Sequence, residues 1–95
     1  MLEKLTNVIK EKMEKAPSID STYKFVLKDL GVIYLDFPNK QVHNEDKEAD
    51  CAVYMKPENF EKLLKGELNP TTAFMLGKIK VKGDIGAAMK LTQFI

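Results

Sequence analysis

Arginine is absent from this chain of 95 residues, and all fifteen basic residues are lysine. The planar guanidinium group forms the paired hydrogen bonds with which proteins recognise guanine, phosphate and carboxylate groups. Fourteen acidic residues reduce the formal net charge to +1, so positive charge does not dominate either. We therefore expect no nucleic acid among the partners of this protein.

Cysteine and histidine occur once each, as Cys51 and His43. A single cysteine excludes an internal disulfide and a zinc site made of several thiolates. Cys51 has no cationic neighbour that would lower its pKa, and His43 lies on a polar segment. We interpret Cys51 as a packed or half-buried structural thiol and His43 as an exposed surface residue. Without a nucleophile beside a base, the sequence predicts no catalytic residue and no enzyme activity.

Signals for metals and cofactors are also weak. Asp46, Glu48 and Asp50 lie close together, but they lack the glycine and the final glutamate of a calcium-binding EF-hand loop. Gly83 and Gly86 do not form a dinucleotide-binding fingerprint. We expect a solvated turn at residues 46–48 and neither a bound metal nor a cofactor.

No apolar run approaches the roughly 18 residues that a membrane-spanning helix needs. The N-terminal residues alternate charged and apolar side chains, unlike the apolar core of a secretory signal. Hydrophobic residues make up 44% of the chain, which is ordinary for a globular protein. These features predict one domain, residues 1–95, in the cytoplasm.

The first sixteen residues predict an amphipathic helix that Pro17 ends. The main interpretation is a helix packed on the domain, and the alternative is a helix lying on a membrane surface. Glu3, Glu11 and Glu14 mix with lysines on its polar face and weaken the alternative. The apolar positions at helical spacing are Leu2, Leu5, Val8, Ile9 and Met13.

Four strands are predicted next, because short polar turns separate segments of alternating or mostly apolar residues. Short connections of this kind favour an antiparallel meander. The third segment is polar, which is typical of an edge strand. The predicted strands are Thr22–Leu27, Val32–Phe37, Gln41–Glu45 and Ala49–Met55.

The second half of the chain predicts a helix from Pro57 to Gly66 and another from Pro70 to Gly77, capped by Asn69. Residues 78–82 alternate strictly as a strand, with Lys78, Lys80 and Lys82 on one face. Asp84 can cap a last helix. Its apolar stripe is expected at Ile85, Ala88 and Met89, widened by Leu91 and Phe94. Helices segregated from a largely antiparallel sheet define an α+β fold.

Several short motifs follow one another in a fixed order in this half of the chain. They are Ala-Asp-Cys at 49–51, Asn-Pro at 69–70, Ala-Phe and Gly-Lys at 73–78, Lys-Gly at 82–83 and Gly-Ala-Ala-Met-Lys-Leu at 86–91. From about Ala49 to the C-terminus the sequence therefore resembles the sterol carrier protein 2 (SCP2) family.

The resemblance implies a curved, five-stranded, mostly antiparallel sheet covered by four to five helices. An apolar tunnel between the two layers would hold a fatty acid, a fatty acyl-CoA, a phospholipid or a sterol. Leu76 stands where family members commonly have a glutamine, which puts preference for a hydroxylated ligand such as a sterol in doubt. Carried over by position, the ligand-binding residues are Val53, Met55, Phe60, Leu64, Phe74, Met75, Leu76, Ile79, Val81, Ile85, Ala88, Met89 and Phe94.

Other interpretations stay open at this point. The apolar residues of the second half simply fill a core, or they bind a partner helix or a second copy in a homodimer. The domain alternatively presents a lipophilic intermediate, such as a quinone precursor, to a separate enzyme. The three lysines of residues 78–82 form a solvated face, or they guide anionic head groups in a transient membrane contact.

Overall fold

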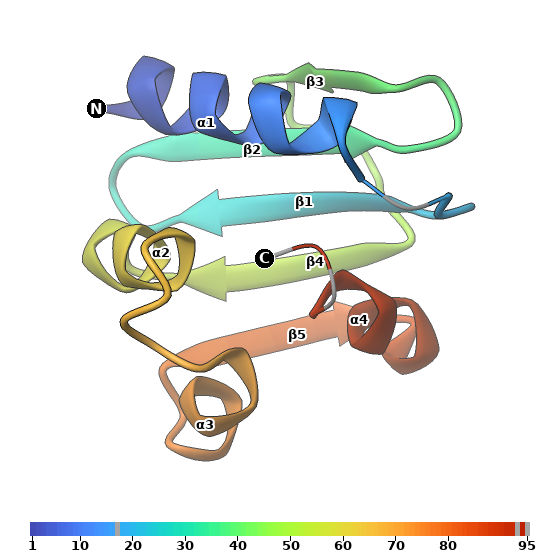
Figure 1. Cartoon of the computed structure of the whole chain (residues 1–95). Helices are drawn as coiled ribbons and strands as arrows, with labels where there is room; N and C mark the ends of the chain where they lie inside the picture. Colours follow the sequence, from blue (N-terminus) through green and yellow to red (C-terminus); the bar gives the residue numbers. More distant parts are fainter. Residues whose placement is uncertain (17, 93, 95) are drawn as a thin grey trace.

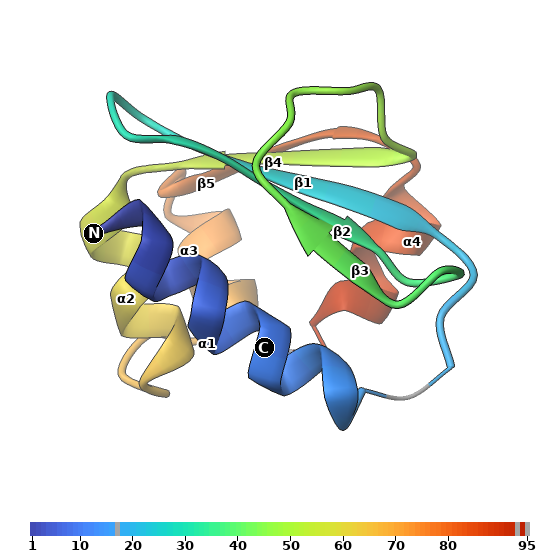
Figure 2. The same cartoon turned by 90° about the horizontal axis from the view of Figure 1, so that it is seen from above.

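The computed structural model describes residues 1–16, 18–92 and 94. Within this part of the chain, five strands form one open sheet and four helices lie against one of its faces (Figures 1 and 2). The predicted α+β class is confirmed. In chain order the elements are α1 (Leu2–Glu14), β1 (Thr22–Leu27), β2 (Gly31–Asp36), β3 (Gln41–His43), β4 (Cys51–Met55), α2 (Pro57–Leu64), α3 (Pro70–Met75), β5 (Ile79–Gly83) and α4 (Ile85–Leu91).

The sheet is mixed, with strand order β3-β2-β1-β4-β5. Three neighbouring pairs are antiparallel, but β4 runs parallel to β1, with Phe25 opposite Val53. The predicted meander is therefore wrong at β4, which lies beside β1 and not beside β3. The prediction of β3 as an edge strand is confirmed.

The segment between β3 and β4 explains this difference. Residues 44–50 cross the face of the sheet opposite the helices instead of making a tight turn (Figure 2). The Tyr34 hydroxyl donates to the carbonyl of Glu48 at 2.9 Å, and the Lys24 ammonium pairs with Asp46 at 2.7 Å. These contacts hold the crossing segment against β1 and β2, so β4 enters the sheet on the far side of β1.

The helix α1 packs on the sheet, as its spacing predicts. Leu5, Ile9 and Met13 are buried in the core, whereas the membrane-surface alternative would leave them exposed. The predicted stop at Pro17 lies outside the described residues. Within the part of the chain that the structure describes, no helix has the length and apolar character needed to cross a bilayer.

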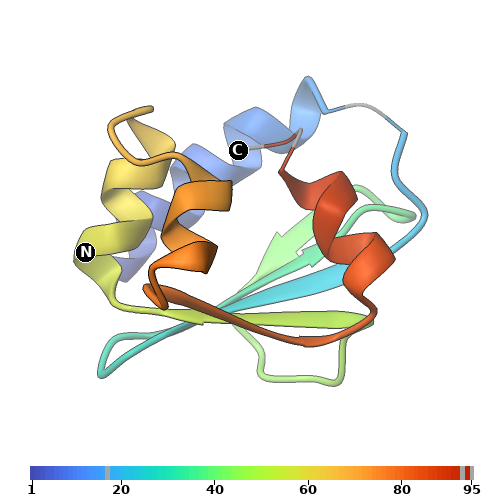
Figure 3. The same ribbon diagram turned by 90° about the horizontal axis from the view of Figure 1, so that it is seen from below.

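Local signals fix the positions of α3 and α4. The Asn69 side chain accepts hydrogen bonds from the backbone N–H groups of Thr71 and Thr72 at 2.9 and 3.2 Å. Gly77 ends α3 with a left-handed φ of +74°, and the Asp84 carboxylate caps α4 by accepting from Ala87 N–H at 3.3 Å. Two short helices consequently stand over the two ends of β5, on the same face of the sheet (Figure 3).

Candidate functional site

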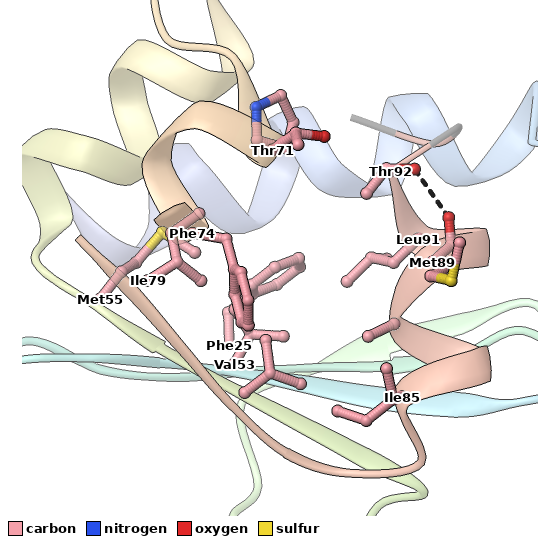
Figure 4. Close-up of a pocket in the computed structure, with 13 residues that line it drawn as sticks. Phe25, Val53, Met55, Thr71, Phe74, Ile79, Ile85, Met89, Leu91 and Thr92 are labelled. Carbon is pink, nitrogen blue, oxygen red and sulfur yellow. Dashed lines mark hydrogen bonds between the residues drawn. The ribbon is translucent and has the colours of Figure 1, made fainter. Parts of the chain in front are cut away.

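An apolar groove of about 280 Å³ lies between α3 and α4, over the inner face of β1, β4 and β5. Figure 4 shows Phe74 of α3 on one side of it and Ile85, Met89 and Leu91 of α4 on the other. The residues that line the groove are Phe25, Val53, Met55, Pro70, Thr71, Phe74, Ile79, Val81, Ile85, Ala88, Met89, Leu91 and Thr92.

The floor of the groove follows from strand register. Phe25 pairs with Val53, and Val53 pairs with Val81, so all three side chains leave the same face of the sheet. Met55 and Ile79 form the next pair along the same face. Alternation along three neighbouring strands thus places an unbroken apolar surface beneath the two helices.

The walls of the groove remain open to solvent. Phe74, Ile85 and Met89 are 54%, 58% and 69% exposed, although all three are large apolar residues. The apolar tunnel expected from the resemblance is therefore not shown by the structure, which has an open groove. The predicted stripe of α4 is divided accordingly, because Ala87 and Leu91 are buried while Ile85 and Met89 are exposed along the groove.

The groove is lined by very few polar side chains. Its polar side chains are Thr71 and Thr92, and the Thr92 hydroxyl already donates to the carbonyl of Met89 at 2.7 Å (Figure 4). Of the residues that the structure describes, no charged one belongs to the lining. Among the described residues, no group of three histidine, cysteine or carboxylate side chains is placed to hold a metal ion. The arrangement suits an apolar ligand without directional hydrogen bonds.

Tyr23 anchors the inner side of α4 to the sheet. Its hydroxyl donates a buried hydrogen bond to the carbonyl of Ala87 at 2.6 Å. Its ring packs edge-on against Phe37 at 5.4 Å, and Phe37 packs likewise against Phe94 at 5.1 Å. Burial raises the pKa of the Tyr23 phenol above its ordinary value, which keeps the donor proton in place.

The thiol of Cys51 is fully buried, so the prediction of a packed structural cysteine is confirmed. Burial raises the pKa of this thiol, and the carboxylates of Asp84 and Asp50 raise it further. A thiol whose anion is disfavoured in this way is a poor nucleophile.

The expectation for His43 is corrected by the structure. Its ring is partly buried and stacks on Tyr34, with centroids 4.7 Å apart, and its Nδ1 accepts from the Glu45 N–H at 3.1 Å. Neighbouring strands β2 and β3 bring the two rings together, which the polar sequence around His43 does not reveal.

Eight of the thirteen residues carried over by resemblance lie together along the groove. They come from β4, α3, β5 and α4, four elements that are adjacent in space. Their role in binding a ligand stays a prediction. They are Val53, Met55, Phe74, Ile79, Val81, Ile85, Ala88 and Met89.

The other five residues of that set lie elsewhere. Phe60 is buried against Phe25, with ring centroids 4.7 Å apart, and Leu64 is half-buried beside the same core. Phe94 packs on Phe37. Met75 and Leu76 are 80% and 65% exposed and do not line the groove, because α3 ends there.

Sequence reasoning missed five lining residues, namely Phe25, Pro70, Thr71, Leu91 and Thr92. Phe25 reaches the groove only because β1 pairs with β4, and that pairing is absent from the predicted meander. Pro70 and Thr71 were interpreted only as the start of a helix. Their position facing α4 depends on how α3 docks, and no local pattern gives that.

Comparison with known proteins places this chain in a family. Residues 2–95 match the SCP-2 sterol transfer family, and the chain belongs to it. The chain is 37% identical over 101 residues to "Hydroxysteroid dehydrogenase-like protein 2" of Danio rerio. The match covers 100% of this chain but 24% of that protein, so the chain spans less than a quarter of its length.

Solved structures share the fold. The crystal structure of sterol carrier protein 2 like 2 from Aedes aegypti has a TM-score of 0.88 at 19% identity, covering 99% of this chain and 95% of that one. Sterol carrier protein 2 from Aedes aegypti, solved in complex with the C16 fatty acid palmitate, has a TM-score of 0.81 at 18% identity. That match covers 97% of this chain and 91% of that one. At these identities the likeness concerns the fold.

Proposed function

We propose that this protein is a non-catalytic lipid carrier that holds a fatty acid, a fatty acyl-CoA or a sterol-like lipid in the groove between α3 and α4. One observation carries the proposal: the lining is apolar and uncharged, yet several of its large side chains are left exposed. The palmitate complex of a protein with the same fold supports a fatty acid as the ligand.

The energetics favour an acyl chain. Each methylene removed from water contributes about 0.8 kcal/mol, so a C16 chain yields about 12 kcal/mol before opposing terms. The loss of freedom on association and the ordering of the acyl chain reduce this binding free energy by several kcal/mol. The expected dissociation constant is then near micromolar or somewhat tighter. Because the groove offers few hydrogen-bond partners, we expect weak discrimination among lipids of similar length.

Organic extraction of the purified protein, followed by mass spectrometry of the extract, tests this function. Native mass spectrometry of the same preparation distinguishes a lipid carrier from a protein-interaction module. A lipid carrier shows a monomer with an added mass of a few hundred daltons, whereas a dimerisation module shows a doubled mass without lipid. A homodimer with an empty groove would contradict the proposal.

A second candidate function rests on the relatives. The chain covers less than a quarter of a dehydrogenase-like protein, so in that relative the matching part is joined to a larger polypeptide. An accessory domain of this kind would present a lipophilic intermediate to a separate enzyme. Affinity capture with a lipid-loaded protein tests it, because an accessory domain retains a specific enzyme and an independent carrier does not. The cytoplasmic location stays a prediction of the sequence.

A further inference from the structure

The five methionines of this chain differ in whether solvent reaches them and whether they line the groove. Met89 lines the groove on the α4 side and is 69% exposed (Figure 4). Met55 also lines the groove but is only 5% exposed, and Met13 is buried in the core. Met75 and Met1 are 80% and 64% exposed but do not line the groove. Met89 alone combines access to solvent with a place in the groove.

Access to solvent decides which sulfur atom an oxidant modifies first. The thioether of methionine reacts as the neutral group, so its oxidation requires no deprotonation. The thiol of Cys51 reacts as the thiolate, but it is fully buried and burial raises its pKa. An oxidant in solution therefore reaches the sulfur of Met89 well before the sulfur atoms of Cys51 and Met55.

We propose that Met89 is a peroxide-sensitive modification site whose oxidation weakens the hold of the groove on its lipid. A lone pair of the Met89 sulfur attacks one oxygen of hydrogen peroxide, so that an S–O bond forms and the O–O bond breaks. The proton on the transferred oxygen passes to the departing hydroxide, which leaves as water. Sulfur loses two electrons and the peroxide gains them, and the product is methionine sulfoxide. The effect on lipid binding rests on the proposed carrier function, whereas the selective oxidation does not.

The sulfoxide fits this groove poorly. Its oxygen is a strong hydrogen-bond acceptor, and burying such a group without a donor costs free energy. The proton of the Thr92 hydroxyl is already engaged by the carbonyl of Met89 at 2.7 Å. The other hydroxyl of the lining belongs to Thr71, on the opposite wall. The oxidised side chain therefore keeps its oxygen in water, and the ligand loses apolar contacts on the α4 side.

A bound lipid should in turn protect this sulfur. An acyl chain between α3 and α4 covers the side chain of Met89, but it leaves Met75 in solvent because Met75 lies outside the groove. The loaded protein then resists oxidation at Met89, and the empty protein is modified. Methionine sulfoxide is reduced again by sulfoxide reductases, so the modification is reversible.

Peroxide treatment of the purified protein tests the proposal. Lipid-free and palmitate-loaded protein are exposed to hydrogen peroxide, and peptide mass spectrometry follows oxygen addition at each methionine. Met89→Leu removes the exposed sulfur of the groove. The matched control Met75→Leu removes an exposed sulfur outside the groove. For the lipid-free samples, the affinity of each variant for a fluorescent fatty acid is compared before and after treatment.

We expect Met89 to be oxidised before Met55, and palmitate to slow oxidation of Met89 several-fold without affecting Met75. Peroxide should reduce the affinity of the wild type and of Met75→Leu roughly tenfold, and a sulfoxide reductase should restore it. The affinity of Met89→Leu, whatever its value, should not change with peroxide.

Two results would overturn the proposal. One is oxidation of Met55 as early as Met89. The other is a response to peroxide that is the same in Met89→Leu and Met75→Leu, whether both keep or both lose their affinity. In either case, fatty-acid binding by the untreated wild type would leave the carrier function standing. Absence of that binding would contradict the carrier function and, with it, the effect proposed for Met89.

Discussion

Met89 is the residue whose replacement best separates ligand binding from folding. Its side chain lines the groove and is 69% exposed, so a change there does not disturb the core. Met89→Lys places an ammonium group against the acyl chain, and we expect fatty-acid affinity to fall roughly tenfold or more, since a charge beside an apolar ligand is poorly solvated. Titration with a fluorescent fatty acid measures the loss.

The matched control is Asn7→Lys, which adds the same charge on the exposed side of α1. We expect it to bind fatty acid like the wild type. If Met89→Lys also binds like the wild type, the ligand does not occupy this groove.

Replacement of Tyr23 tests whether its hydrogen bond to Ala87 anchors α4 to the sheet. Tyr23→Phe removes the buried hydrogen bond from the hydroxyl to the carbonyl of Ala87, which destabilises the protein by about 1–2 kcal/mol. Urea unfolding followed by circular dichroism measures this change. Tyr54→Phe, on the outer face of the sheet, should change the free energy of unfolding by much less.

The raised pKa of Tyr23 also predicts that the stability of the protein depends on pH. The folded pKa of Tyr23 is raised by burial, so its contribution to stability is complete below the unfolded pKa of about 10. That contribution is lost as the pH rises through the folded pKa, because the phenolate is tolerated only in the unfolded chain. Wild-type protein should therefore lose more stability than Tyr23→Phe as the pH increases above about 10. A parallel decline in both proteins would show that folding does not raise the pKa of Tyr23 above its value in the unfolded chain.

At the scale of single residues, the sequence identified most of the floor and both walls of the groove. Alternation predicted Ile79 and Val81 on one face of their strand, and the resemblance added Val53 and Met55; all four side chains lie on the same face of the sheet. Phe60 and Phe94 were assigned to the same site, but aromatic contacts hold them in the core instead. Periodicity shows which side chains point inward, and it does not distinguish a core position from a groove position.

Among the helices and strands, α4 is the one we expect to respond to ligand. It spans only seven residues, and its second residue is Gly86, which costs roughly 1 kcal/mol in helix stability relative to alanine. Its backbone amides should exchange with deuterium faster than those of β1, because local opening requires little free energy in a short helix of this kind. Palmitate should slow exchange in α4 and leave α1 unchanged, as hydrogen-exchange mass spectrometry can show. Protection confined to α1 would place the ligand elsewhere.

The bounds of the elements were largely predictable, whereas their arrangement was not. Asn69, Gly77 and Asp84 mark helix ends through caps and a left-handed turn, and each does so in the structure. The pairing of β4 with β1 depends on the crossing of residues 44–50 over the sheet. That crossing is held by contacts between residues far apart in sequence, which no local signal encodes.

For the whole molecule, ligand binding and stability are linked. A ligand that binds only the folded state stabilises it by about 2.7 kcal/mol when its free concentration is a hundred times its dissociation constant. Titration with palmitate should therefore raise the melting temperature progressively, as calorimetry measures. A melting temperature that stays constant while fatty acid binds would show that the lipid also associates with the unfolded chain.

The position of the acyl chain can be measured directly by nuclear magnetic resonance with labelled methionine methyl groups. Met55 and Met89 line the groove, while Met13 is a buried residue of α1. With bound palmitate, we predict nuclear Overhauser effects from the acyl chain to the methyl groups of Met55 and Met89, and none to Met13. Contacts to Met13 without contacts to Met55 and Met89 would contradict a lipid site between α3 and α4.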